Sequence, residues 1–218
     1  MGQASRSKFF PPADSADADG LLGIGGQLTP DWLLDAYRHG IFPWPPNERT
    51  LAWFSPDPRA VIEFDELHVS RRLRDTLRSS KFRVTRDADF AGVIHGCGTA
   101  QDRRGQTWLT PSMLKAYIHL HELGHAHSVE VWHGDELAGG TYGVQIGGLF
   151  AAESMFYRVR DASKVAVVKL VEHLQTQGFA LLDIQQLTPH TARLGAKEIP
   201  RAEYLRRVAA AVELSLRF

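Results

Sequence analysis

Residues 147–185 read GGLFAAESMFYRVRDASKVAVVKLVEHLQTQGFALLDIQ and determine the architecture of the chain. A glycine-rich apolar strand ends near Glu153, a helix follows over residues 162–177, and a second apolar strand ends with Asp183 and Gln185. Strand ends beside a crossover helix are where α/β architectures usually build their sites. We therefore expect two acids and an amide to lie at neighbouring strand ends, next to the apolar face of the helix.

The segments on either side of this block predict an α+β protein with two domains. Residues 1–20 are expected to form a loose arm of a small N-terminal domain, residues 1–58, and the prolines before residue 59 mark the boundary. The larger domain, residues 59–218, is expected to contain strands at 60–64, 82–85, 127–132, 136–142, 147–153 and 179–184, and helices at 70–79, 87–95, 111–123, 162–177, 189–194 and from 200 onward.

The composition is that of an ordinary globular protein. The 218 residues are 44% hydrophobic and 23% charged, with a formal net charge of zero. No apolar run approaches the roughly 20 residues that cross a bilayer, and the N-terminus lacks the apolar region of a secretory signal. Cys97 is the only cysteine, which excludes a disulfide within the chain. We expect a cytoplasmic protein that is a monomer and has no membrane partner.

Positive charge is concentrated in residues 71–86, where Asp75 is the only acid. Arginine dominates this segment, and its planar fork binds two phosphate oxygens at once. Two interpretations stay open, a solvated helix face and a contact with one end of an RNA, which a non-catalytic RNA-binding protein would also need. The second interpretation predicts a phosphate-binding face made of Arg71, Arg72, Arg74, Arg78, Lys81 and Arg83.

Residues 121–125, HELGH, match the zinc-peptidase pattern in which two histidines one helical turn apart bind metal and the glutamate activates water. Gly124 is expected to end the helix, so that His125 leaves the face that carries the first histidine. The extended pattern also requires glycine and histidine where this chain has Ser128 and Val131. We expect no metal, and a zinc peptidase stays the alternative function.

Motifs of one known family occur in order along nearly the whole chain. They include YRHGIFPW (37–44), WFSPDPR (53–59), TWLT (107–110), HLHELGHAHSVEVW (119–132), GGxYG (139–143), ESMF (153–156), ASK (162–164), Asp183, Gln185, HT (190–191), LG (194–195) and EIPR (198–201). In these residues the sequence resembles the leucyl/phenylalanyl-tRNA–protein transferases.

The resemblance implies a fold, an activity and two partners. The larger domain would have an acetyltransferase-like fold, with a central mixed sheet flanked by helices. The enzyme would transfer Leu, Phe or Met from aminoacyl-tRNA to the α-amino group of proteins that begin with Arg or Lys, within the bacterial N-degron pathway of protein degradation. No acetyl-CoA or other cofactor is implied, because the ester of the charged tRNA already activates the acyl group.

The resemblance also implies roles for individual residues. Asp183 would polarise Gln185 or accept charge from the acceptor amine. Glu153 would hold the cationic acceptor or the aminoacyl α-amino group, and which of the three takes the proton stays open. Aromatic residues would lie at the tRNA 3′ end, where stacking on the terminal adenosine contributes about 1–3 kcal/mol: Tyr37, Trp44 and Trp108.

The helix over residues 162–177 also carries apolar side chains at spacings of three and four, which share one face. Plain core is the competing interpretation, and the resemblance favours a pocket for the Leu or Phe side chain made of Thr141, Phe150, Met155, Val167, Leu170, Leu174 and Leu182. A known relative carries Met, Phe and Phe where this chain has Thr141, Leu170 and Leu174. Smaller walls predict a roomier pocket and a changed preference among Leu, Phe and Met.

Overall fold

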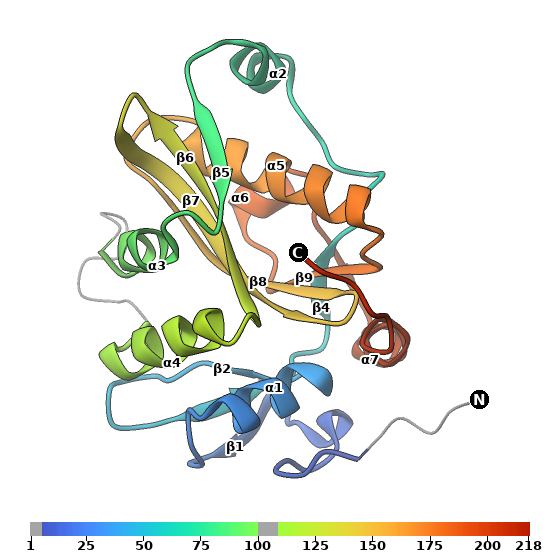
Figure 1. Cartoon of the computed structure of the whole chain (residues 1–218). Helices are drawn as coiled ribbons and strands as arrows, with labels where there is room; N and C mark the ends of the chain where they lie inside the picture. The colour runs from blue at the N-terminus through green and yellow to red at the C-terminus, as the bar shows by residue number, and fades with distance from the viewer. Residues whose placement is uncertain (1–5, 100–108) are drawn as a thin grey trace.

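The computed structural model describes residues 6–99 and 109–218, and its main feature is a seven-stranded sheet (Figure 1). The strand order is β10-β4-β9-β8-β7-β6-β5, and neighbours are antiparallel except for β8 and β9. The strands are β4 Arg59–Ile62, β5 Arg83–Arg86, β6 Ala126–His133, β7 Glu136–Ile146, β8 Leu149–Tyr157, β9 Leu181–Gln185 and β10 Lys197–Ile199. The predicted α+β class with a central mixed sheet is confirmed.

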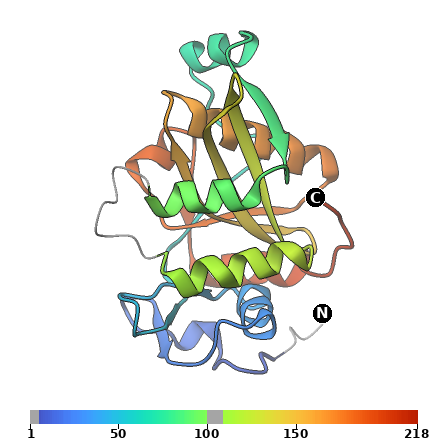
Figure 2. The same cartoon turned by 60° about the vertical axis from the view of Figure 1, so that its left-hand side comes forward.

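Helices cover both faces of this sheet, with α3 and α4 on one face and α5 on the other (Figures 1 and 2). The helices of the larger domain are α2 Arg71–Arg78, α3 Phe90–Thr99, α4 Pro111–Glu122, α5 Ala162–Gln177, α6 Pro189–Ala192 and α7 Arg201–Ala211. Helix α3 begins later than predicted because the Asp89 carboxylate accepts a hydrogen bond from the backbone N–H of Gly92 (2.8 Å) and caps the helix there. In the described ranges, no helix is long and apolar enough to cross a membrane.

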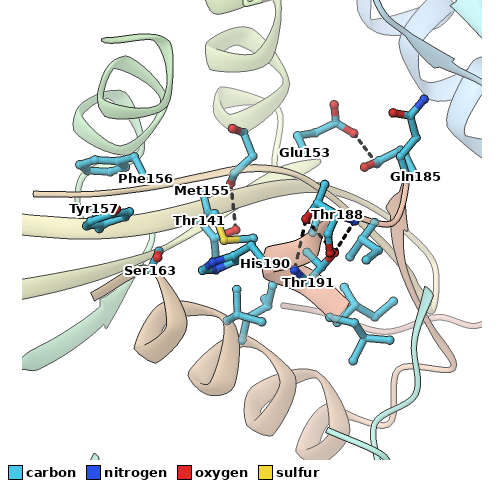
Figure 3. Close-up of a pocket in the computed structure, with 18 of the residues that line it drawn as sticks. Thr141, Glu153, Met155, Phe156, Tyr157, Ser163, Gln185, Thr188, His190 and Thr191 are labelled. Atoms are coloured by element: carbon cyan, nitrogen blue, oxygen red, sulfur yellow. Dashed lines mark hydrogen bonds between the residues drawn. The ribbon is translucent and has the colours of Figure 1, made fainter. Parts of the chain in front are cut away.

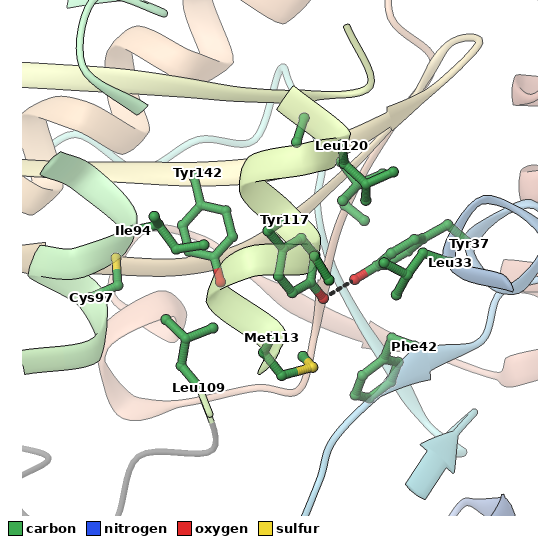
Figure 4. Packing of buried hydrophobic residues seen from close by; sticks show 14 of the residues in the cluster. Leu33, Tyr37, Phe42, Ile94, Cys97, Leu109, Met113, Tyr117, Leu120 and Tyr142 are labelled. Atoms are coloured by element: carbon green, nitrogen blue, oxygen red, sulfur yellow. Dashed lines mark hydrogen bonds between the residues drawn. The ribbon is translucent and has the colours of Figure 1, made fainter. Parts of the chain in front are cut away.

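The N-terminal part forms a second sheet of three short strands in the order β1-β3-β2. Its elements are β1 Leu21–Ile24, α1 Pro30–Arg38, β2 Phe42–Pro43 and β3 Ala52–Phe54. The apolar core of this small domain is continuous with that of the larger one, because Leu33 and Tyr37 cluster with Met113, Tyr117 and Tyr142 (Figure 4). The boundary near residue 59 stays a prediction.

Residues 6–20 pack against the small domain, which corrects the predicted loose arm in the part that the structure describes. Phe9 stacks on Trp32 with ring centroids 4.5 Å apart, and Phe10 meets Trp53 edge-on at 4.7 Å. Two adjacent phenylalanines therefore anchor the segment. The composition of the residues that follow, which are rich in Pro, Asp and Ala, is typical of a loose segment and gives no sign of this packing.

A gap lies between β8 and β9, the single parallel pair in the described sheet. Strands β8 and β9 pair only over residues 149–151 and 181–183. Beyond these residues β8 stays paired with β7, and the end of β9 pairs with β4. The two strands therefore separate toward their C-terminal ends. Residues 152–158 line a shared space between them, together with Leu182 and residues 184–186.

Candidate active site

A cavity of about 890 Å³ occupies the gap between β8 and β9 (Figure 3). This volume lies within the range of about 300–1,000 Å³ that is usual for small-molecule sites. Trp44 of the small domain lines the cavity together with residues of β8 up to Tyr157 at the end of that strand. Glu153 and Gln185 both lie on its wall, so the structure brings the ends of β8 and β9 together as a site.

An irregularity in β8 sets the position of Glu153. In the pairing with β7, Tyr142 lies opposite Ser154 and Gly143 lies opposite Ala152, so Glu153 is the extra residue between the two pairs. A β-bulge of this kind redirects one side chain, and bulges are frequent next to active sites. The register therefore turns Glu153 away from the regular alternation of the strand.

The Glu153 carboxyl group is held by two neighbours. It accepts hydrogen bonds from the Tyr117 hydroxyl (3.0 Å) and from the side-chain amide of Gln185 (3.0 Å). Burial raises the pKa of Glu153 to about 8, although hydrogen bonds from Tyr37 and Tyr117 oppose the increase. Near neutral pH the protonated acid therefore predominates, in equilibrium with a smaller fraction of carboxylate that can accept a proton.

A strained backbone fixes the direction of Gln185. Its φ angle is +58°, a left-handed conformation that residues other than glycine rarely adopt. The Asp183 carboxylate stabilises this turn by accepting a hydrogen bond from the backbone N–H of Gln185 at 2.9 Å. Such outliers cluster at functional sites, where the surrounding structure maintains them. Here the turn directs the Gln185 amide toward Glu153.

Asp183 itself is fully buried and is not among the described residues that line the cavity. Its carboxylate forms a bidentate pair with Arg59, at 2.8 Å to Nε and 2.6 Å to Nη2, and also accepts from the Tyr204 hydroxyl at 2.8 Å. The Arg59 guanidinium lies between the rings of Phe42 (4.6 Å) and Tyr204 (4.4 Å). This geometry keeps the Asp183 carboxylate out of the cavity, and it fits a positioning role.

Three residues that hold the site together were not predicted from the sequence as site residues: Arg59, Tyr117 and Tyr204. Arg59 is the last residue of the family motif at 53–59, which was the one available signal. Tyr117 lies inside a helix and Tyr204 inside another, where each is indistinguishable from an ordinary core residue.

The predicted side-chain pocket is partly assembled in the cavity. Five of its seven residues line the cavity wall: Thr141, Met155, Val167, Leu170 and Leu182. Phe150 and Leu174 are buried but are not among the described lining residues. Phe150 instead stacks on Phe218 with centroids 5.4 Å apart, so it supports the wall from behind. Polar residues that sequence reasoning did not include also line the cavity (Figure 3): Ser163, Thr188, His190 and Thr191.

The three aromatic residues predicted at the tRNA 3′ end differ in position and exposure. Trp44 lines the cavity, is 36% exposed, and meets Phe42 edge-on with ring centroids 6.2 Å apart, so its contact with RNA stays a prediction. Tyr37 is 1% exposed and its hydroxyl bonds that of Tyr117 (Figure 4), so the predicted contact of Tyr37 with RNA is wrong. The ring is buried because Tyr37 lies on the face of α1 that packs into the core, together with Leu33 and Ala36. Trp108 lies outside the described residues.

The predicted phosphate-binding residues are all exposed along α2 and β5. Arg72 approaches Asp161 at 3.8 Å, and Lys81 Nζ donates to the backbone carbonyl of Arg160 at 3.3 Å. These contacts place the basic segment beside the loop that follows β8. RNA binding by this segment stays a prediction, because a solvated helix face has the same exposure.

The HELGH segment adopts the helix end that was predicted. Helix α4 ends at Glu122, Gly124 has a φ angle of +78°, and the backbone N–H of His125 bonds the carbonyl of Leu120 at 2.8 Å. The His121 ring stacks on Phe90 with centroids 4.3 Å apart. Within the described ranges, no group of three metal-ligating residues comes together. The segment therefore lacks the two-histidine helix face that a zinc peptidase requires.

Sequence comparisons show the family of the chain. Two family models match the chain, leucyl/phenylalanyl-tRNA protein transferase over residues 61–209 and its N-terminal domain over residues 26–57. The chain belongs to the leucyl/phenylalanyl-tRNA–protein transferase family. As a member of this family it is a tRNA-dependent aminoacyltransferase.

Relatives match over most of their length. A leucyl/phenylalanyl-tRNA–protein transferase of Pseudomonas syringae pv. syringae (strain B728a) is 51% identical over 203 residues, which cover 91% of this chain and 89% of the relative. One from Anaeromyxobacter sp. (strain Fw109-5) is 50% identical and covers 95% of this chain and 89% of its own. Among solved structures, a GCN5-related N-acetyltransferase from Kribbella flavida has a TM-score of 0.40 at 12% identity, covering 79% of this chain and 61% of the other.

Proposed function

We propose that this transferase moves Leu, Phe or Met from its tRNA ester to the α-amino group of a protein that begins with Arg or Lys. The product carries one additional N-terminal residue joined by a peptide bond, and it is thereby marked for degradation in the cytoplasm. The family assignment supports the donor and the protein acceptor. The preference for N-terminal Arg or Lys and the role in degradation are proposed in addition to the family assignment.

The observation that carries the proposal is the contact between Glu153 and Gln185 on the wall of a cavity that is apolar on one side. Met155, Val167 and Leu170 supply apolar wall for the transferred side chain. A hydrogen-bonded acid and amide beside such a wall suit a reaction that joins an amine to an apolar aminoacyl group. The charged tRNA is already an activated ester, so positioning and proton transfer are sufficient for catalysis.

The reaction exchanges an ester for an amide. The acceptor α-amine attacks the ester carbonyl carbon, the new C–N bond forms, and the bond from that carbon to the ribose oxygen breaks. The proton released by the amine ends on the ribose oxygen. Before the attack, the carboxylate form of Glu153 takes one proton from the acceptor ammonium group, since a pKa of about 8 matches the roughly 7.7–8.0 of an α-amine, and this proton then passes to solvent. The side-chain amide of Gln185 donates to Glu153, which leaves its carbonyl oxygen to orient the amine.

Asp183 acts through Gln185 and not on the substrate. It holds the left-handed turn of Gln185 through a backbone hydrogen bond, while Arg59 occupies both of its oxygens. Trp44 stacks on the terminal adenosine of the donor in this proposal, and the support is that Trp44, 36% exposed, lines the same cavity. The arginines of α2 supply phosphate contacts further along the tRNA.

Transfer of labelled Leu from charged tRNA to a peptide that begins with Arg tests the proposal. We expect transfer to this peptide and none to the same peptide acetylated at its N-terminus or beginning with Asp. A relative with measured activity serves as the positive control. Absence of transfer alongside an active control would refute the proposal, and cleavage of the peptide without tRNA would instead support the peptidase alternative.

A further inference from the structure

Tyr157 presents an uncovered aromatic ring at one end of the cavity. It is the last residue of β8, it lines the cavity, and it is 51% exposed. Its partner in β7 is Gly139, which has no side chain to cover the ring. A Cβ at position 139 would approach the Cβ of Ala162 to 2.7 Å, so packing against α5 favours the glycine. The same packing leaves the Tyr157 ring open to a ligand.

The residues after Tyr157 connect this ring to the basic segment. Arg158 lines the cavity and is exposed, and Arg160 is exposed as well. Lys81 donates to the backbone carbonyl of Arg160, and Arg72 on α2 reaches the same loop. Positive charge therefore continues from the cavity end to the face of α2. An aromatic ring followed by arginines is the combination with which proteins hold single-stranded nucleic acid.

The spacing along β8 fits a nucleotide beyond the terminal one. Tyr157 lies four residues after Glu153, which at about 3.3 Å per residue is about 13 Å along the strand. The aminoacyl ester must lie at Glu153 and Gln185, and the terminal adenosine lies between the ester and the rest of the RNA. A ring this far from the reacting carbon is beyond the amino acid and in reach of the RNA.

We propose that Tyr157 stacks on the cytidine that precedes the terminal adenosine of the donor tRNA. The single-stranded 3′ end then leaves the cavity over Tyr157 and Arg158 toward α2. This inference rests on the proposed aminoacyl transfer, because it assigns a further binding contact to the same donor.

Two short donors test the assignment, the leucyl ester of adenosine and the leucyl ester of the dinucleotide cytidylyl-adenosine. In the wild-type protein we expect the added cytidine to lower KM by about 5- to 150-fold, the equivalent of one stacking contact of about 1–3 kcal/mol. Tyr157→Ala should abolish this gain, and Tyr157→Phe should retain it, because phenylalanine keeps the aromatic face. Melting temperatures of both variants verify folding.

The possible results separate the two proposals. An equal gain from the cytidine in Tyr157→Ala and in the wild type would overturn the assignment. So would an equal rise in KM for both donors in Tyr157→Ala, since the ring would then contact the adenosine or the amino acid. If the wild-type protein transfers Leu from neither short donor nor from intact Leu-tRNA, the proposed function itself fails.

Discussion

At the scale of single residues, Glu153 combines two requirements that usually conflict. A proton acceptor must be reachable by its substrate, yet its pKa must be raised from the ordinary carboxylate range toward that of an amine. The bulge in β8 turns the side chain to the cavity wall, and burial beside Tyr117 raises its pKa to about 8. The raised pKa should be visible as a loss of stability as pH rises through the range from about 4.5 to 8.

Glu153→Gln should stabilise the protein increasingly as pH rises from about 4.5 to 8. The unfolded chain releases this proton near pH 4.5 and the folded protein only near pH 8, so the wild type loses stability throughout that window and the variant does not. Melting temperatures at pH 5, 6.5 and 8.5 should show a difference that grows by at least about 2–4 °C, the equivalent of about 1 kcal/mol. Glu213→Gln, at an exposed position, is the matched control, and a constant difference for Glu153→Gln would contradict the pKa assignment.

Leu170 and Thr141 should set the size of the transferred side chain. Because Leu170 lines the cavity, Leu170→Phe narrows it and should lower transfer of Phe relative to Leu by about tenfold. Leu174→Phe is the matched control, since that side chain is buried outside the cavity lining and its enlargement should cost about 1–3 kcal/mol of stability instead. Competition between Phe-tRNA and Leu-tRNA gives the ratio, and an unaltered ratio in Leu170→Phe would remove this residue from the pocket.

At the scale of elements, the Arg59–Asp183 pair joins β4 to β9 and also reaches the small domain. Arg59 Nη1 donates to the backbone carbonyl of Gly40 at 3.2 Å, while its guanidinium holds Asp183. Because both side chains are fully buried, removing one leaves an uncompensated charge in the interior. The pair therefore fixes the end of β9, from which Gln185 projects.

Asp183→Asn should lower the free energy of unfolding by about 3–5 kcal/mol, measured by urea denaturation. Glu172→Gln is the control, because its ion pair with Lys169 is on the surface and should contribute at most about 0.5 kcal/mol. A loss below about 1 kcal/mol in Asp183→Asn would show that the buried pair does not hold β9 in place.

The long elements could be predicted from the sequence, and the short or non-local ones could not. Helix α5 was predicted with its observed bounds because Asp161 and Gly178 flank sixteen periodic residues. Strand β2 has two residues and β3 has three, too few to show an alternating pattern. The contact between Arg59 and Asp183 spans 124 positions in sequence, so neither local pattern nor composition indicates it. The same applies to the bulge at Glu153, which depends on the register of β7.

At the scale of the whole molecule, the two domains share one core. The hydroxyl groups of Tyr37 and Tyr117 bond across the interface, and Leu33 clusters with Met113 of α4 (Figure 4). The small domain also supplies Trp44 to the cavity that the larger domain forms. Each domain therefore depends on the other for both stability and the site.

Thermal or urea unfolding should occur in a single cooperative transition. The small domain contains Trp32, Trp44 and Trp53, so tryptophan fluorescence reports mainly on it, whereas far-ultraviolet circular dichroism reports mainly on the larger sheet and helices. A shared core predicts coincident midpoints for the two probes. Midpoints that differ would show that the domains unfold independently.

Gln185 and Glu153 form the proposed transfer centre in the gap between β8 and β9. Its most direct test is the single-turnover rate of Leu transfer from saturating Leu-tRNA to an Arg-starting peptide, in wild-type protein and in Gln185→Ala. We predict a loss of about 10²-fold or more with an unchanged melting temperature, because the acceptor amine is no longer oriented. Gln175→Ala, an exposed glutamine on α5, should react at the wild-type rate. A Gln185→Ala rate within about threefold of the wild type would show that Gln185 is not part of the transfer centre.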